Sequence, residues 1–79
     1  MLIDLNFDIS FGDIVIDTKC KHYLVIRNTF NDYFSVVVID LTTSRIYDEY
    51  RSISDMKLDM NIIGAIKKNE IVIRRERHD

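Results

Sequence analysis

The chain has 79 residues, 47% of them hydrophobic, with a net charge of −2, one cysteine and neither proline nor tryptophan. This length predicts a single small domain that buries only about 63% of its unfolded surface, so the core needs nearly every apolar residue. The net charge argues against non-specific binding to nucleic acid, which depends on many Lys and Arg contacts to phosphate.

The composition also indicates a location. One cysteine excludes an internal disulfide, and the N-terminus has neither the basic segment nor the long apolar run of a secretory signal. The longest aliphatic run, residues 36–39, is far shorter than the roughly 20 residues that cross a bilayer. We therefore expect a cytoplasmic protein with no membrane role.

The first segment, residues 1–11, alternates apolar and polar side chains. Its large apolar residues at every second position are Leu5, Phe7, Ile9 and Phe11. This pattern predicts an amphipathic strand that covers one end or one face of a sheet. Gly12 then permits a sharp turn, and the renewed alternation over residues 13–18 predicts a second strand.

The centre of the chain is a predicted hairpin over residues 21–40. Residues 22–28 alternate, residues 28–32 carry the polar signal of a turn, and residues 33–40 are apolar on both faces. Such a strand is buried on both sides. Because so small a domain has few residues to cover two faces, either the first segment lies over one of them or a partner does.

The second half of the chain is predicted to begin with an edge strand and a helix. Residues 45–50 alternate, with Ile46 and Tyr50 on one face. Ser52 and the aspartate three positions later have the spacing of a capping box, and apolar residues at i, i+3 and i+7 predict a short helix over 53–60.

The last part is predicted to be a closing hairpin. Residues 62–66 are apolar, residues 67–70 are polar enough for a turn, and residues 71–74 resume the strand. The predicted organisation is one domain of three parts: a covering strand (1–11), a barrel (12–74) and a frayed polar tail (75–79).

Five to six short strands about ten residues apart, with one short helix, predict a mainly β fold in which an antiparallel sheet bends toward a barrel. The Gly12-Asp13-Ile14-Val15 string, the long central strand, the IYDEYRSISDM turn and the closing IIGAI strand resemble the SH3-like small barrels of phages and mobile elements. The opening string is also similar to that of the endoribonuclease toxins of plasmid-maintenance modules. This chain lacks the Arg-Pro element that typically follows the opening hairpin of those toxins.

Candidate catalytic and metal sites are sparse. Cys20 and His22 would point the same way on an extended segment, but two ligands do not make a metal site, and we expect neither metal nor cofactor. RNA cleavage requires a general acid, a general base and arginines that bind the phosphate. Here such a set would have to come from residues scattered along the chain: His22, Tyr23, Arg27, Arg45 and Asp48. No spacing demands that chemistry.

Two groups of residues are candidates for binding. The exposed aromatic side chains and an aspartate of the central turn would contact a protein: Phe30, Tyr33, Tyr23, Tyr47 and Asp32. Basic residues of the closing hairpin would contact phosphate: Lys67, Lys68, Arg74, Arg75 and Arg77. For the second group we favour a solvated hairpin whose charges keep an edge strand from pairing with another chain.

The leading hypothesis is a small non-catalytic binding module, encoded by a phage or mobile element, that inhibits or recruits a cellular protein. Residues 1–40 hold six acidic and three basic side chains, which suit a basic surface on such a target. The alternative is a small-barrel nucleic-acid-binding protein or endoribonuclease. A third possibility is a homodimer formed through an exposed strand, either residues 33–40 or the first segment.

Overall fold

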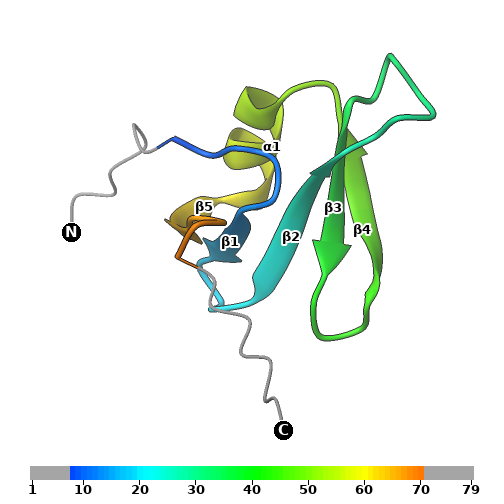
Figure 1. Cartoon of the computed structure of the whole chain (residues 1–79). Coiled ribbons are helices and arrows are strands. Elements are labelled where there is room, and N and C mark those ends of the chain that lie inside the picture. Colours follow the sequence, from blue (N-terminus) through cyan, green and yellow to red (C-terminus); the bar gives the residue numbers. More distant parts are fainter. Residues whose placement is uncertain (1–7, 71–79) are drawn as a thin grey trace, which may run out of the picture.

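Five strands and one helix follow one another along residues 8–70, the part of the chain that the computed structural model describes (Figure 1). The elements are β1 (Ile14–Asp17), β2 (His22–Arg27), β3 (Val36–Asp40), β4 (Arg45–Tyr50), α1 (Ile53–Met60) and β5 (Ile62–Ile66). The mainly β class and the short helix over 53–60 are confirmed. The strand predicted over 71–74 and the frayed tail predicted over 75–79 lie outside the described residues.

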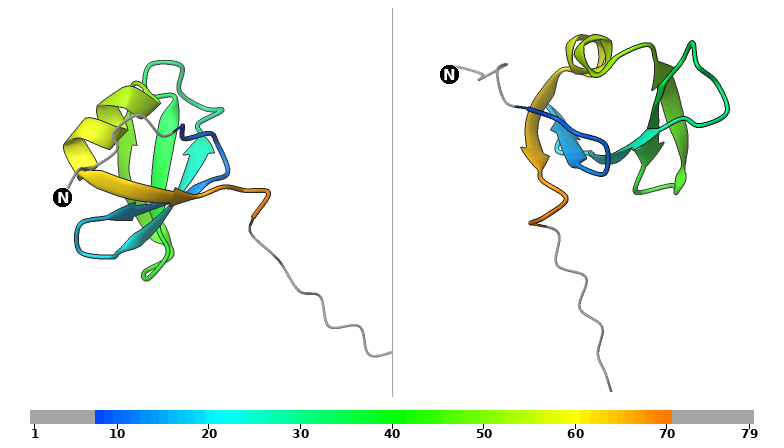
Figure 2. Two further views of the ribbon diagram at one scale, coloured as in Figure 1. Left: turned by 90° about the vertical axis from the view of Figure 1, so that its left-hand side faces the viewer. Right: turned by 45° about the horizontal axis from the view of Figure 1, so that its top comes forward.

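The five strands form one antiparallel sheet in the order β4-β3-β2-β1-β5. β4 and β5 are the ends of this order, and within residues 8–70 no backbone pairing joins them, so the sheet is not closed into a barrel. Figure 2 shows that the sheet bends strongly and that α1 lies over one end of it. The predicted antiparallel sheet is confirmed, whereas its closure is not seen.

The core lies on one face of this sheet, which we call the core face. Alternate strand residues and two methionines of α1 form it: Val15, Tyr23, Val25, Val36, Val38, Tyr50, Ile62, Met56 and Met60. Side chains of a strand alternate between its two faces, so the residues between these point to the opposite side, the outer face.

Helix α1 begins and ends where the sequence predicts. Ser52 is its N-cap, and the Ser52 Oγ accepts the Asp55 N–H at 3.1 Å, which satisfies one of the unpaired donors of the first turn. Asn61 ends the helix in the left-handed conformation. The Tyr50 hydroxyl donates to Asp59 Oδ2 at 2.6 Å and ties the helix to β4.

The prediction of a strand over residues 1–11 is wrong for the described part of that segment. Hydrogen bonds between Ser10 and Asp13 give this part a turn instead. The Ser10 N–H donates to Asp13 Oδ2 at 2.8 Å, and the Asp13 N–H donates to the Ser10 carbonyl at 3.1 Å. Ile9 nevertheless belongs to the core, and Phe11 packs against it. The described part of the segment therefore covers the core face, as expected, without forming a strand.

β3 begins only at Val36, although the prediction placed its start at residue 33. The Asn31 Oδ1 accepts the N–H groups of Tyr33 at 2.9 Å and Phe34 at 3.2 Å. Hydrogen bonds of this local kind compete with the pairing of a strand. The aromatic residues before Val36 thus belong to a loop. In the strand itself Val36, Val37 and Val38 are buried, whereas Ile39 and Asp40 are half-buried.

β4 contains a bulge that the alternation of its sequence does not reveal. Tyr50 pairs with Val36 and Ile46 pairs with Ile39, with a shift of register between Val38 and Ile39. One extra residue in a strand reverses the alternation beyond it. The prediction that Ile46 and Tyr50 share a face is therefore wrong: Tyr50 enters the core, and Ile46 is 63% exposed on the outer face.

Candidate protein-binding surface

The outer face of the sheet carries a continuous row of aliphatic side chains. Ile66 pairs with Ile14, Ile14 with Leu24, Leu24 with Ile39, and Ile39 with Ile46. Residues that pair directly in neighbouring strands lie on the same face. Every strand therefore contributes one aliphatic residue to this row. The outer face thus carries apolar side chains, as the core face does.

An open hollow of about 560 Å³ lies on the outer face where β2, β3 and β4 adjoin the loop at 28–35. Aliphatic residues, one acidic and one basic residue, and the start of the loop line it: Ile26, Arg27, Asn28, Thr29, Phe30, Asn31, Val37, Ile46 and Glu49. Val37 pairs with Ile26 and is buried, yet it lies outside the cluster of core residues on the core face. Together with Ile46, these two residues give the hollow an apolar floor.

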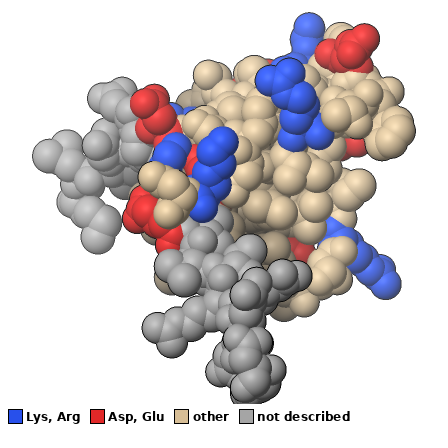
Figure 3. All heavy atoms as spheres, viewed as in Figure 1, with Lys and Arg blue, Asp and Glu red and all other residues tan. Residues whose placement is uncertain are grey.

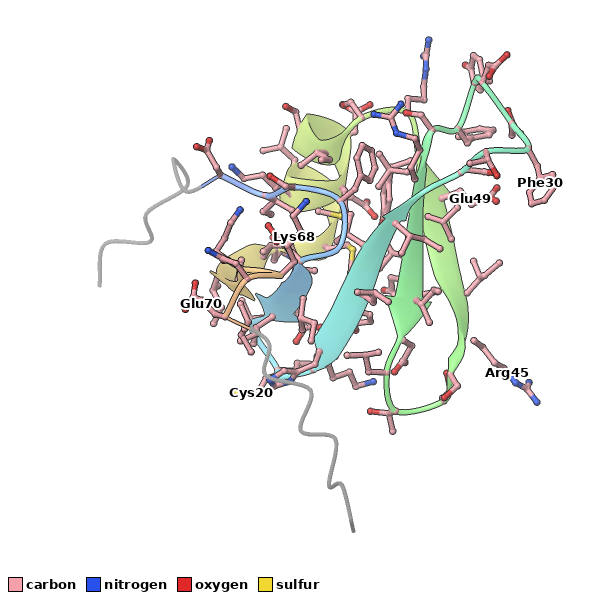
Figure 4. The ribbon with its side chains drawn as sticks, viewed as in Figure 1. Cys20, Phe30, Arg45, Glu49, Lys68 and Glu70 are labelled. Carbon is pink, nitrogen blue, oxygen red and sulfur yellow. The ribbon has the colours of Figure 1, made fainter. Side chains whose placement is uncertain are left out.

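The loop at 28–35 has a defined shape because side-chain and backbone hydrogen bonds of Asn28 hold it. The Asn28 Oδ1 accepts the Phe30 N–H at 2.9 Å, and the Asn28 N–H donates to the Ser35 carbonyl at 2.9 Å. Held in this way, the Phe30 side chain is 98% exposed. Figure 4 shows Phe30 at the outer end of the loop, beyond Glu49.

The charge offered inside the hollow is negative. The Glu49 carboxylate accepts one long hydrogen bond, from Asn28 Nδ2 at 3.4 Å. The other charged lining residue is Arg27, but its guanidinium lies over the Phe11 ring, 4.9 Å from the ring centroid, on the side of the core. Asp32, exposed in the same loop but not among the lining residues, carries a second negative charge.

Three of the five residues predicted to bind a protein lie together in this loop. Phe30, Asp32 and Tyr33 are all exposed. The Arg51 guanidinium lies 4.4 Å from the centroid of the Tyr33 ring, so Tyr33 already has a cation–π partner. Phe30 is therefore the aromatic residue that the loop leaves most available.

The other two predicted residues, Tyr23 and Tyr47, lie on the core face. Their ring centroids are 4.9 Å apart, and Tyr23 is only 2% exposed. The Tyr23 hydroxyl donates to Asp17 Oδ2 at 3.0 Å. Burial and this hydrogen bond raise the pKa of Tyr23 to about 12. Tyr23 is thus a structural residue, and Tyr47 is the member of the pair that reaches solvent.

The residues that form the floor and the charge of the hollow were not predicted. Ile26, Val37, Ile46 and Glu49 are spread over three strands, and only the register of the sheet brings them together. One signal in the sequence did indicate a second apolar surface. The central strand is apolar on both faces, so its second face must be covered by another segment or by a partner.

The basic residues of the nucleic-acid hypothesis are only partly described: Arg74, Arg75 and Arg77 lie outside the described residues. The Lys67 ammonium lies 2.6 Å from the carboxylate of Asp13, which neutralises it. Lys68 is exposed near Glu70, and Figures 3 and 4 show basic and acidic side chains mixed around β5 rather than gathered in one basic patch.

The residues considered for RNA cleavage do not all lie together: Tyr23 and Arg45 both pair with Asp40, whereas Arg27 lies at the other end of β2. His22 and Arg27 are the first and last residues of β2, about 17 Å apart along an extended strand. The His22 Nδ1 lies 2.9 Å from the Cys20 carbonyl oxygen, and Arg45 starts the edge strand β4. Within residues 8–70, no three His, Cys, Asp or Glu residues are grouped so that they could hold a metal ion.

Of the two strands proposed for a homodimer, only residues 36–40 are fully described as a strand, and residues 1–7 of the first segment lie outside the described residues. β3 lies between β2 and β4 and is paired on both sides. The described part of the first segment forms no strand. A dimer formed by strand pairing within the described residues would have to use β4 or β5, the two strands at the ends of the sheet.

No protein-family model, no curated protein and no solved structure matches this chain. None of the helices in residues 8–70 has the length and apolar character needed to cross a membrane.

Proposed function

We propose that this domain is a small non-catalytic module that binds a cellular protein, and thereby inhibits or recruits it, through the hollow and the loop at 28–35. The observation that supports this most directly is the apolar floor of Ile26, Val37 and Ile46 next to the exposed ring of Phe30. Apolar surface of this kind, rimmed by polar groups, is typical of protein interaction sites.

Three finer features belong to the same proposal. One strongly bent antiparallel sheet with a short helix before its last described strand supports an SH3-like barrel. The resemblance of the strand pattern to small barrels of phages and mobile elements supports such a source. The single cysteine, which can form no internal disulfide, supports a cytoplasmic location.

The test is affinity capture from a nuclease-treated bacterial lysate with the wild-type domain and site variants as bait. Ile46→Ser and Phe30→Ser remove apolar surface at the hollow. Leu58→Ser is the matched control, because Leu58 is 74% exposed on α1, away from the hollow. Circular dichroism first establishes that all variants fold.

We expect at least one protein that the wild type and Leu58→Ser retain and that both hollow variants lose. A protein captured equally by all four baits would show that the hollow is not the binding surface. Recovery of nucleic acid alone, from an untreated lysate, would favour the nucleic-acid-binding alternative instead.

A further inference from the structure

We propose that the hollow recognises a segment of the partner protein in which an arginine stands next to a large aliphatic or aromatic side chain. This inference names the chemistry of the partner and rests on the proposed function. It depends on three features that line one hollow: an apolar floor, a carboxylate and an exposed aromatic ring.

The floor selects the apolar side chain. Ile26, Val37 and Ile46 present only aliphatic surface, and Ile46 is the most exposed of the three. A leucine or phenylalanine placed there removes apolar surface of both partners from water. A polar side chain in the same place would lose its hydrogen bonds to water and find no acceptor or donor among these three side chains.

The carboxylate selects the arginine. Glu49 is half-buried, and its hydrogen bond from the Asn28 amide is long, at 3.4 Å, so the oxygens remain available for a stronger donor. A guanidinium offers two parallel N–H groups to a carboxylate, which an ammonium does not. Within residues 8–70 no lysine or arginine is ion-paired with Glu49.

The loop favours arginine over lysine for a second reason. Phe30 lines the same hollow as Glu49, and its ring is almost fully exposed. The planar guanidinium stacks on aromatic faces more readily than an ammonium does. The same loop already shows this contact once, between Arg51 and Tyr33.

The same features disfavour a nucleic-acid strand in the hollow. Phosphate would meet the negative charge of Glu49 in the hollow, and Arg27 lies over the Phe11 ring on the side of the core. A protein segment with a positive charge is the ligand that this arrangement complements.

The test is an NMR titration of the ¹⁵N-labelled full chain with three peptides of equal length: acetyl-Gly-Leu-Arg-Gly-amide, and the same peptide with glutamate or with lysine in place of arginine. We expect the arginine peptide to shift the amide signals of Ile26, Phe30, Val37, Ile46 and Glu49. The glutamate peptide should bind about fivefold more weakly, the ratio that a partly exposed charge pair provides, and the lysine peptide should lie between them.

Charge reversal supplies the decisive comparison. Glu49→Lys should invert the order, so that the glutamate peptide binds more tightly than the arginine peptide. Glu70→Lys changes the net charge by the same amount at an exposed turn away from the hollow, and should leave the order unchanged.

The outcomes separate this inference from the function on which it rests. If all three peptides shift the hollow signals with equal affinity in both the wild type and the Glu49→Lys variant, the arginine preference is wrong while the hollow remains a binding surface. If peptides shift only signals elsewhere, the inference is also wrong, and the capture experiment with Ile46→Ser decides the proposed function independently. A rise in apparent mass by light scattering without peptide, abolished by Ile46→Ser, would identify a second copy as the occupant of the hollow and overturn the inference.

Discussion

The Lys67 ammonium lies 2.6 Å from the Asp13 carboxylate, and this contact joins residues that are 54 positions apart in the sequence. Asp13 is fully buried, and its carboxylate also accepts the N–H groups of Ser10 and Lys68, each at 2.8 Å. Lys67 donates in addition to the Asp8 carbonyl at 3.1 Å. The Asp13 carboxylate thus links the segment before β1 to the chain after β5. These two segments lie at the β5 end of the sheet.

The first prediction concerns the stability that this carboxylate provides. Asp13→Ala leaves the Ser10 and Lys68 N–H groups without their acceptor and Lys67 without its partner. Each unpaired donor costs about 1–3 kcal/mol when buried, so we expect the free energy of unfolding to fall by about 3 kcal/mol. Urea unfolding followed by circular dichroism measures this loss. Asp32→Ala, a change at an exposed loop position, is the control and should lose less than about 0.5 kcal/mol.

The second prediction concerns the stability of the fold at acidic pH. Burial disfavours the Asp13 carboxylate, but the hydrogen bonds from Lys67, Ser10 and Lys68 and the charge of Lys67 outweigh burial and lower the pKa of Asp13 below its ordinary value of 3.8. Because the folded state holds this group ionised, its contribution to stability is present above about pH 4 and is lost as the pH falls through the folded pKa.

The acid dependence is measured from urea midpoints at a series of pH values. For the wild type we expect the free energy of unfolding to decrease below about pH 4, whereas in Asp13→Asn the decrease should be smaller. It should not vanish, because hydrogen bonds from the Lys21 N–H, the Tyr23 hydroxyl and the Lys19 N–H outweigh burial and lower the pKa of Asp17 as well. Identical acid slopes in the two proteins would contradict the assignment to Asp13.

Local patterns in the sequence were sufficient for most of the elements. Alternation predicted β1, β2 and β4, an apolar run before a polar turn predicted β5, and the capping residue Ser52 with its apolar spacing predicted α1, because these signals lie within a few residues of the element that they specify. The same local reasoning explains two errors. Asn31 and Asp13 use side-chain oxygens to accept hydrogen bonds from nearby backbone N–H groups. These bonds prevent a strand at residues 33–35, where the apolar run predicts one, and in the described part of residues 1–11, where alternation predicts one.

The candidate site was predicted only in part, since its components depend on register. Phe30 is conspicuous in the sequence as an aromatic residue within a polar turn, and the structure places it at the surface. Glu49 and Ile46 could not be assigned to the outer face, because the bulge in β4 shifts the alternation between Ile46 and Tyr50. The pair of Asp13 and Lys67 was likewise hidden, because no pattern relates charges that far apart in the chain.

The third prediction concerns the stability of the fold at alkaline pH. Burial and the hydrogen bond to Asp17 raise the pKa of Tyr23 from 10.0 to about 12, so the folded state keeps a proton that the unfolded chain releases from about pH 10. The stability associated with this group is therefore present below pH 10 and is lost as the pH rises toward 12. The loss from Tyr23 alone is on the order of 2 kcal/mol.

Tyr23→Phe tests this assignment while keeping the ring in the core. At neutral pH we expect a loss of about 1 kcal/mol, because Asp17 loses one hydrogen bond. Between pH 10 and 12 the variant should lose less stability than the wild type does, in urea unfolding at each pH. Tyr33→Phe, at an exposed loop position, serves as the control. If the alkaline loss is unchanged in Tyr23→Phe, another group is responsible for it.

The last prediction compares the two glycines of the chain. Gly12 has a φ of 96°, and a Cβ placed on it would lie 3.2 Å from the Cδ of Lys68. Gly12→Ala therefore combines a disfavoured backbone conformation with a crowded contact, and should lower the free energy of unfolding by about 2 kcal/mol. Gly64 lies in β5 with no atom within 4 Å of the corresponding Cβ position. Gly64→Ala should thus be neutral or stabilise the protein by up to about 1 kcal/mol, because alanine restricts the unfolded chain. Urea unfolding of the two variants side by side tests both claims, and an equal loss in both would mean that the conformation of Gly12 is not the cause.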